Sequence, residues 1–317
     1  MESIGSALKQ LANKQLAEKN MEQIVSELNH HPFVRRLKMK HPEFDDTVQQ
    51  LHLARIYQAV KEYDHCSACP GLDQCPNDLQ GHYTQLTVEP FGETSQVVEK
   101  KVSCKKYIAN QTQKNIHKRI RSFYLDDDII KRGYTVSEIY ERDSARSKAV
   151  EQITDYVIKT LQQGLQSEGL YLVGDFGTGK TFLMTYMLNE LAKEGFTGVI
   201  VYVPDLIEDL KTVMKNGDKL NEMMDTMKEA DLLVFDDIGA ENLNPWARDH
   251  VIGTILNYRM NRKPTFFTSN YDLKGLQKHF CFTDKEGQND VKGRRLMERI
   301  EHFVQVITVS GENQRGK

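Results

Sequence analysis

An eight-residue stretch, GDFGTGKT at 174–181, has the residue types and spacing of a loop that binds phosphate. Its glycines let the backbone wrap closely, so that amide N–H groups can point at phosphate oxygens. Lys180 can reach the β- and γ-phosphates, and Thr181 can ligate magnesium. The apolar run LYLV precedes the stretch and the helical pattern FLMTYMLNELAKEG follows it. This context predicts a site for ATP and Mg²⁺, formed by Gly174, Asp175, Phe176, Gly177, Thr178, Gly179, Lys180 and Thr181.

Two adjacent carboxylates end another apolar run, LLVFDD at 232–237. Asp236 stands about 55 residues after the phosphate loop, where the next-but-one strand would end beside that loop. It is therefore the expected partner of magnesium. Asp237 occupies the position at which many P-loop hydrolases carry a glutamate that activates water, and aspartate is one methylene shorter. The alternative for Asp237 is a residue that only hydrogen-bonds the groups around the metal.

Polar residues after the next two apolar patterns suit the same chemistry. FFTSN ends at Asn270, whose amide could hold the attacking water or sense the γ-phosphate, unless it is only a turn residue. KGRRLMERI places Arg295 and Arg299 four residues apart, on one face of a predicted helix. Such a helix suits an arginine that acts on the nucleotide of a neighbouring subunit. A solvated basic face is the alternative.

Four of the five cysteines lie in the first third of the chain, at Cys66, Cys69, Cys75 and Cys104. Cys66 and Cys69 form a C-x-x-C pair that supplies two corners of a tetrahedron, and structural zinc needs two more ligands. Cys75, His82 and Cys104 compete for those two places. An iron–sulfur cluster on the four cysteines and free thiols without metal are the alternatives. Zinc would add folding energy to a small domain of modest apolar content.

The composition bounds the class of protein. A chain of 317 residues is long enough for two domains, and 39% hydrophobic with 27% charged residues is ordinary for a globular protein. The net charge of −3 gives no overall attraction for nucleic acid, so DNA contacts would need local basic patches. No apolar run approaches the about 18 residues of a membrane helix, and the N-terminus has no secretory core. We expect a cytoplasmic protein without a membrane partner, in which Cys281 is a buried small hydrophobe.

Apolar periodicity places these residues on predicted elements. Spacings of three and four predict helices within 7–63, and looser alternation at 85–102 around Pro90 and Gly92 predicts a small hairpin. The polar, basic stretch 105–121 is expected to be a connecting helix or linker. From about Val136, five short apolar runs near 170, 199, 232, 264 and 303 alternate with helical patterns. This alternation predicts an α/β fold with a parallel sheet.

Two basic patches could contact DNA phosphates. Lys211, Lys215 and Lys219 recur every four residues on one predicted helix face. The alternative is a solvated face that Glu208 and Asp209 balance. The second patch comprises Lys114, Lys118, Arg119 and Arg121. Neither patch is rich in aromatic residues, so stacking of bases is not predicted.

The motifs GDFGTGKT, LLVFDDIGAE, FFTSN, RRLMERI and the terminal GENQR, in this order, resemble AAA+ ATPases of the bacterial replicative-helicase loader group. The resemblance covers nearly the whole chain, more loosely in the cysteine cluster. It implies binding of the hexameric replicative helicase through the N-terminal domain, and delivery of that helicase onto single-stranded DNA by a self-associated, ATP-bound motor. It also implies site roles: a Walker B pair at Asp236 and Asp237, sensor 1 at Asn270, an arginine finger at Arg299 and sensor 2 at Arg315.

The expected organisation is a helix-rich, zinc-binding helicase-interaction domain at 1–110, a basic linker at 111–135 and an AAA+ P-loop ATPase domain at 136–317. We expect slow, partner-stimulated ATP hydrolysis. Three other functions are a transposition-helper ATPase of the IstB type, a small-molecule P-loop kinase and a non-catalytic zinc adaptor. The cysteine cluster argues against the first, an arginine acting in trans against the second, and the intact phosphate loop against the third.

Overall fold

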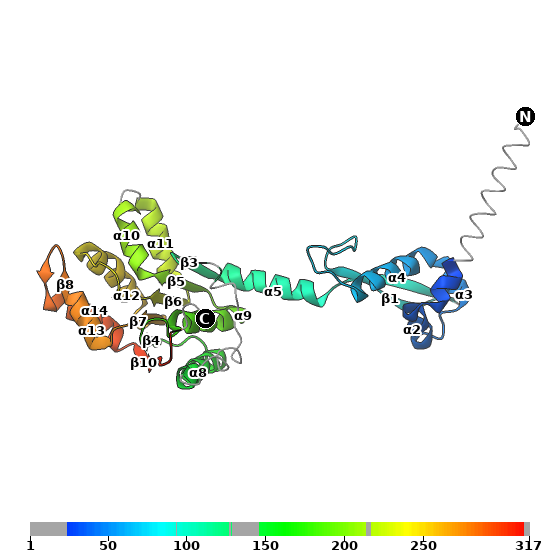
Figure 1. Ribbon diagram of the computed structural model, residues 1–317. Helices are drawn as coiled ribbons and strands as arrows, with labels where there is room; N and C mark the ends of the chain where they lie inside the picture. The colour runs from blue at the N-terminus through cyan, green and yellow to red at the C-terminus, as the bar shows by residue number, and fades with distance from the viewer. Residues whose placement is uncertain (1–23, 93, 127, 129–145, 214–216, 314–317) are drawn as a thin grey trace, which may run out of the picture. The chain divides into compact units, whose positions relative to one another are not determined.

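A computed structural model describes residues 24–92, 94–126, 128, 146–213 and 217–313. The chain divides into two compact units, Met1–Gln111 and Thr112–Lys317, and the division falls inside helix α5 (Lys105–Arg119). Each unit has its own hydrophobic core. Figure 1 colours the described part of the N-terminal unit from blue to cyan and that of the C-terminal unit from blue-green to red. The two units are described separately below.

The N-terminal unit packs helices against a β-hairpin. Its elements are α2 (Pro32–Lys40), α3 (Asp46–Leu51), α4 (Leu53–Ser67), β1 (His82–Phe91) and β2 (Thr94–Ser103). The predicted hairpin is confirmed, with antiparallel pairing from His82↔Ser103 to Phe91↔Thr94. Val34, Ile56 and Val97 are fully buried where the helices meet the hairpin. The helices predicted within 7–63 are confirmed where the structure describes the chain, although His52 leaves the helical region (φ −112°, ψ 21°) and divides one of them.

The C-terminal unit is built on a six-stranded, fully parallel sheet in the order β10-β4-β7-β6-β5-β3. The strands are β3 (Ile120–Phe123), β4 (Gly169–Val173), β5 (Gly198–Tyr202), β6 (Leu232–Asp236), β7 (Thr265–Ser269) and β10 (Val304–Thr308). The five predicted apolar runs form β4, β5, β6, β7 and β10, which confirms the α/β prediction. Because the strands are parallel, their carboxyl ends meet at one edge and bring the residues that follow them together.

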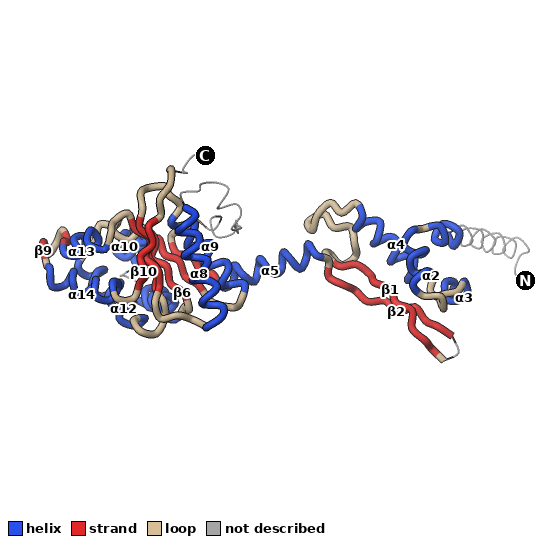
Figure 2. Tube along the Cα trace, turned by 90° about the horizontal axis from the view of Figure 1, so that it is seen from below, coloured by secondary structure: helices blue, strands red, loops and turns tan. Residues whose placement is uncertain are grey.

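Helices cover both faces of this sheet (Figure 2). Their bounds are α8 (Ser147–Gln163), α9 (Lys180–Lys193), α10 (Val203–Val213), α11 (Gly217–Glu229), the π-helix η2 (Ala247–Ile252), α12 (Gly253–Arg259), α13 (Leu273–Cys281) and α14 (Asp290–Glu301). The core on one face includes residues of α8 and α9, and the other core includes residues of α10 to α14. Along β4, Leu170 and Leu172 enter the first core and Tyr171 the second, as period-two alternation requires.

The structure differs from the predicted linker at 111–135. This segment contains the end of α5 and strand β3, whose four residues pair with β5 from Ile120↔Gly198 to Phe123↔Val201. A four-residue edge strand with only Ile120 buried leaves almost no periodicity in the sequence, which is why it was not predicted. Residues 129–135 lie outside the described part of the chain.

Candidate functional site

The loop 174–179 connects β4 to α9 at the carboxyl edge of the sheet. Gly177 (φ 75°) and Gly179 (φ 90°) have left-handed backbones that side chains other than glycine rarely adopt. A Cβ at Gly177 would also lie 1.9 Å from Oδ1 of Asn313. Lys180 starts α9, so the free amides at that helix end face the loop. The glycines predicted to shape a phosphate cradle therefore have the backbone that such a cradle needs.

Lys180 joins the phosphate loop to the end of β7. Its Nζ donates hydrogen bonds to the carbonyl oxygens of Gly174 (2.8 Å) and Asp175 (2.9 Å) and to Oδ1 of Asn270 (2.8 Å). The side chain is 7% exposed, so its charge is held among oxygen atoms at a largely buried position. The predicted phosphate-binding lysine and the predicted sensor asparagine are thus in direct contact.

Asp236 ends β6 within a cluster of hydroxyl groups. Thr181 Oγ1 donates to its carboxylate oxygens at 2.9 and 3.0 Å, and Thr268 Oγ1 lies 2.7 Å from Oδ1. Burial raises the pKa of Asp236 to about 6, and the neighbouring Asp237 adds to the rise. The structure therefore brings the two predicted magnesium ligands together. It adds Thr268, for which the only sequence signal was a polar residue inside an apolar strand.

Asp237 and Asn270 form the next contact along this edge. Asn270 Nδ2 donates to Oδ1 of Asp237 at 3.1 Å while its Oδ1 accepts from Lys180. The backbone N–H of Asp237 donates to Thr268 Oγ1 at 2.8 Å, and Asp237 itself has a left-handed backbone (φ 56°). One asparagine side chain therefore connects the cation of the phosphate loop with the second acid of the pair.

Comparison with known proteins agrees with this geometry. Residues 93–317 match the family described as IstB-like ATP binding protein, and residues 1–91 match the primosomal protein DnaI N-terminus. The chain is 32% identical over 317 residues to the replicative helicase loader DnaI of Bacillus subtilis, covering 99% of each. This chain belongs to the DnaI family of helicase loaders.

Two solved structures have the same fold as the C-terminal part of this chain. A crystal structure of DnaI matches with a TM-score of 0.53 and 36% identity, over 63% of this chain and 100% of that one. A putative primosome component from Streptococcus pyogenes matches with a TM-score of 0.51 and 32% identity, over 64% and 99%. The C-terminal unit is thus an AAA+ P-loop domain. Within the described residues, no helix combines the length and apolar character needed to cross a membrane.

Of the two arginines that the family resemblance assigned to the site, Arg299 is not part of this cluster. Arg299 donates from Nη1 to the carbonyl of Gly253 at 2.7 Å, and burial lowers its pKa. It lines a small cavity with Thr265 and Val304, the first residues of β7 and β10. Arg299 therefore lies toward the amino ends of the strands, opposite the phosphate loop of its own chain. Arg315 lies outside the described residues.

The structure describes only part of the predicted lysine stripe. Lys215 lies outside the described residues, and Lys211 is within α10 at a position whose side chain is not described. Lys219 lies in the first turn of α11 and is exposed.

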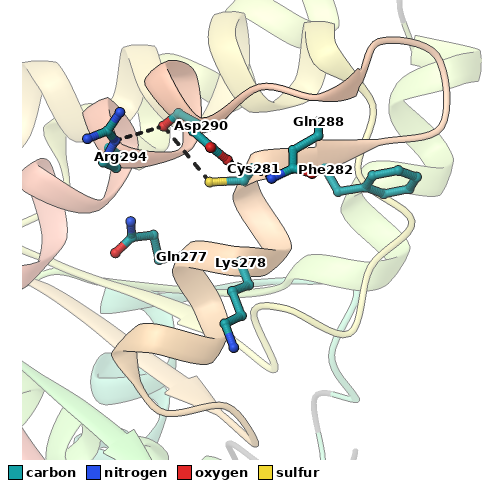
Figure 3. Close-up of a pocket in the computed structure, with 7 residues that line it drawn as sticks. All are labelled: Gln277, Lys278, Cys281, Phe282, Gln288, Asp290 and Arg294. Carbon is teal, nitrogen blue, oxygen red and sulfur yellow. Dashed lines mark hydrogen bonds between the residues drawn. The ribbon is translucent and has the colours of Figure 1, made fainter.

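A separate cavity of about 550 Å³ lies between α13 and α14, beside the short strands β8 (Phe282–Thr283) and β9 (Gly287–Gln288) (Figure 3). Its lining residues are Gln277, Lys278, Cys281, Phe282, Gln288, Asp290 and Arg294. Cys281 is buried, as predicted, and packs so closely that a Cβ on Gly293 would lie 2.4 Å from its Sγ. The cavity includes none of the residues predicted for the nucleotide site.

Cys66, Cys69, Cys75 and Cys104 in the N-terminal unit form no disulfide bond. Among the described residues, no three His, Cys, Asp or Glu side chains are arranged to hold a metal ion, so the predicted zinc site is not shown. Burial raises the pKa of the Cys66 thiol, and the nearby thiols of Cys69, Cys75 and Cys104 add to the rise. His82 is engaged elsewhere, with Nε2 3.0 Å from Ser103 Oγ and Nδ1 3.0 Å from the carbonyl of Gln80.

Each of the four thiols in this unit has an N–H group beside its sulfur. Asn77 Nδ2 lies 3.5 Å from Cys66 Sγ, and Lys106 Nζ lies 3.3 Å from Cys69 Sγ. The backbone N–H groups of Gly81 and Tyr107 lie 3.4 Å from the sulfurs of Cys75 and Cys104. At Cys69, hydrogen bonds from the backbone N–H of Gly71 and from Lys106 lower the pKa of the thiol.

Asp236→Asn is expected to stabilise the nucleotide-free protein at neutral pH. A carboxyl whose folded pKa is raised from 3.8 to about 6 binds its proton more tightly in the folded state. The ionised carboxylate of Asp236 therefore destabilises the folded state. This loss of folding free energy grows as pH rises through this range and reaches about 3 kcal/mol above pH 6. Without magnesium, the variant should melt about 6–12 °C higher than the wild type at pH 7.5, by scanning fluorimetry.

The difference in melting temperature between Asp236→Asn and the wild type should be smaller at pH 4.5, where the wild-type carboxyl is mostly protonated in the folded state. A gap that is equal at both pH values would contradict this assignment. The same variant should bind ATP more weakly in the presence of magnesium, because the amide replaces one anionic ligand.

Proposed function

We propose that this chain is an ATP-dependent loader that binds the hexameric replicative helicase and delivers it onto single-stranded DNA when replication starts or restarts. The observation that carries the proposal is the match along 99% of both chains to a protein named as a replicative helicase loader. The contacts among Lys180, Thr181, Asp236, Asp237 and Asn270 support a working nucleotide site rather than a decayed one.

ATP and magnesium fit the residues at this site. The phosphate-loop amides and Lys180 would hold the phosphates, and Thr181 with Asp236 would hold Mg²⁺, which prefers such oxygen ligands. Bound magnesium supplies positive charge that offsets the charge on the phosphates. Asp237, oriented by Asn270, would accept the proton of the attacking water. We expect slow hydrolysis, because this aspartate is shorter than the usual glutamate.

A transposition helper of the IstB type remains the second candidate, because the C-terminal match carries the IstB-like description. The match of residues 1–91 to the primosomal DnaI N-terminus favours the loader. A small-molecule kinase is less favoured, since the relatives include replicative helicase loaders and a putative ATP-binding protein of an insertion sequence.

Co-purification with the replicative helicase tests the proposal. The full-length chain should form a complex with the helicase of its own organism on gel filtration, with or without ATP. Single-stranded DNA should acquire bound helicase only when the wild-type chain and ATP are both present. Absence of any complex with the helicase, together with capture of a transposase, would favour the IstB-type alternative.

Arg299 is proposed to act on the nucleotide of a neighbouring copy, since it lies far from its own phosphate loop. Arg299→Ala should lower ATP turnover of the assembled protein about tenfold or more, as loss of an arginine finger does. Arg294→Ala is the matched control, because Arg294 lies on the same helix and lines the separate cavity. Turnover should recover partly when Arg299→Ala is mixed with Lys180→Ala, because each supplies what the other lacks. No recovery, or unchanged turnover in Arg299→Ala alone, would refute action in trans.

Zinc in the N-terminal unit is part of the proposal, with Cys66, Cys69, Cys75 and Cys104 as the favoured ligands. All four sulfurs have an N–H group beside them, which suits metal-bound thiolates. His82 is the less favoured donor, because its two ring nitrogens contact Ser103 and Gln80. Zinc bound there would contribute folding energy to this unit.

Contact with single-stranded DNA is proposed for the α10–α11 region, where exposed Lys219 is the described member of the lysine stripe. A few lysines per chain give few phosphate contacts, so useful affinity requires several aligned copies. Binding should therefore depend on ATP and weaken as salt increases.

A further inference from the structure

A buried carboxylate that the nucleotide site does not use lies directly behind it. The side chain of Glu241, four residues after Asp237, has no exposed surface. Its Oε2 accepts the backbone N–H of Gly239 at 2.7 Å, and its Oε1 lies 3.0 Å from Nε2 of His279 on α13. Since a carboxylate only accepts hydrogen bonds, His279 donates from Nε2. The turn that follows the two catalytic acids is thus held by a hydrogen bond within the turn, from Gly239 to Glu241, and by a second one from α13 to Glu241.

The same turn is tied to the end of β7. Ile238 donates its N–H to the carbonyl of Thr268 at 2.9 Å, and its carbonyl accepts from Ser269 Oγ at 2.6 Å. Gly239 has a left-handed backbone (φ 97°), and a Cβ there would lie 2.8 Å from the ring of Tyr271. The position of Asp237 therefore depends on a tightly packed turn that tolerates little displacement.

His279 also contacts the segment that carries Asn270. Its ring stacks on Tyr271, the next residue after Asn270, at a centroid distance of 6.2 Å and an interplanar angle of 26°. The carbonyl of Tyr271 is fixed in turn by the hydroxyl of Tyr171 in β4 at 2.7 Å. One side chain on α13 thus contacts both segments that must keep Asp237 and Asn270 within 3.1 Å of each other.

We infer that Glu241 and His279 are a positioning pair that sets the distance between Asp237 and Asn270 from behind the nucleotide site. Neither residue touches the place that the phosphates would occupy, so the pair acts on the catalytic step rather than on ATP binding. A buried polar contact is weak evidence for a purely stabilising role, because well-packed apolar residues often stabilise a core equally well. This inference rests on the proposed ATP hydrolysis. It adds Glu241 and His279 to the residues that hydrolysis requires.

The test compares His279→Leu with His279→Gln in the full-length protein. Leucine removes the donor, whereas glutamine can place an N–H near the position of Nε2. His279→Leu should lower kcat for ATP about tenfold with KM within about twofold of wild type, because small displacements of reacting groups cost rate rather than binding. His279→Gln should recover kcat to within about threefold of wild type. Lys278→Ala, the exposed neighbour on α13, is the control and should leave both constants unchanged.

Hydrogen exchange of the Gly239 amide provides a readout that does not need turnover. Exchange should be faster in His279→Leu and close to wild type in His279→Gln, because the acceptor Glu241 loses its fixed partner only in the first. If the wild type hydrolyses no ATP, the proposed ATPase activity fails, while exchange at Gly239 still decides on the pair. A rise in KM at unchanged kcat, a glutamine variant as slow as leucine, or unaltered exchange at Gly239 would each overturn the inference.

Discussion

Lys180→Ala is expected to weaken ATP binding by about 100-fold or more, because charged hydrogen bonds to phosphate contribute about 1.5–3 kcal/mol each. The structure shows Nζ of Lys180 holding three oxygen acceptors at 2.8–2.9 Å, which phosphate oxygens can replace. Alanine leaves the loop carbonyls and Asn270 without this donor and removes the positive charge that would face the phosphates. Titration with a fluorescent ATP analogue measures the loss directly.

Lys193→Ala is the matched control, because Lys193 ends the same helix and forms an ion pair with the nearby Glu190. It should bind ATP as the wild type does. The melting temperature offers a second measurement, since saturating ATP should raise it for the wild type and for Lys193→Ala but not for Lys180→Ala. Near wild-type affinity in Lys180→Ala would mean that ATP binds somewhere other than the phosphate loop.

Cys66→Ser is expected to abolish zinc binding and unfold the N-terminal unit while leaving nucleotide binding intact. Structural zinc contributes about 10–16 kcal/mol of apparent binding energy in small domains, more than the stability of most domains of this size. Elemental analysis should find about one zinc per wild-type chain and almost none in the variant. Circular dichroism should show a loss of helix and strand, and ATP affinity should stay within about twofold of wild type because the units have separate cores.

Cys281→Ser is the control for this experiment, since Cys281 is buried in the other unit, and it should retain its zinc. His82→Ala should also retain zinc if the four thiols are the ligands. Iron with visible absorbance in protein prepared without oxygen would replace the zinc proposal with an iron–sulfur cluster. If the wild type contains no metal and Cys66→Ser stays folded, the zinc proposal is wrong and the cysteines are free thiols.

The sequence predicted the parts of this molecule whose signals are local. Short apolar runs predicted β4 to β7 and β10, and the motifs that follow those runs predicted Lys180, Asp236 and Asn270. The parallel sheet then placed these residues at one edge. Strand β3 was not predicted, because four residues with one buried side chain show no alternation of apolar and polar residues.

Contacts between distant residues could not be predicted in the same way. Thr268 meets Asp236 across 32 positions, and His279 meets Glu241 across 38, with no motif that links either pair. These contacts follow from how β7 and α13 pack beside β6, which is decided by the whole core. The ligand set of the cysteine cluster is equally out of reach, because three donors compete for two places and spacing does not rank them.

The left-handed backbone of Asp237 limits how this site can change by mutation. Asp and Asn are the side chains that most readily tolerate such a φ after glycine, whereas others cost about 1–2 kcal/mol there. Exchanging Asp237 for the longer glutamate would gain reach toward water but would strain the turn that carries it. A variant with faster ATP hydrolysis would therefore need further substitutions in the turn at 237–241, introduced before or together with the longer acid. The slow turnover that we propose would in this sense follow from the shape of the backbone, and a single substitution would not remove it.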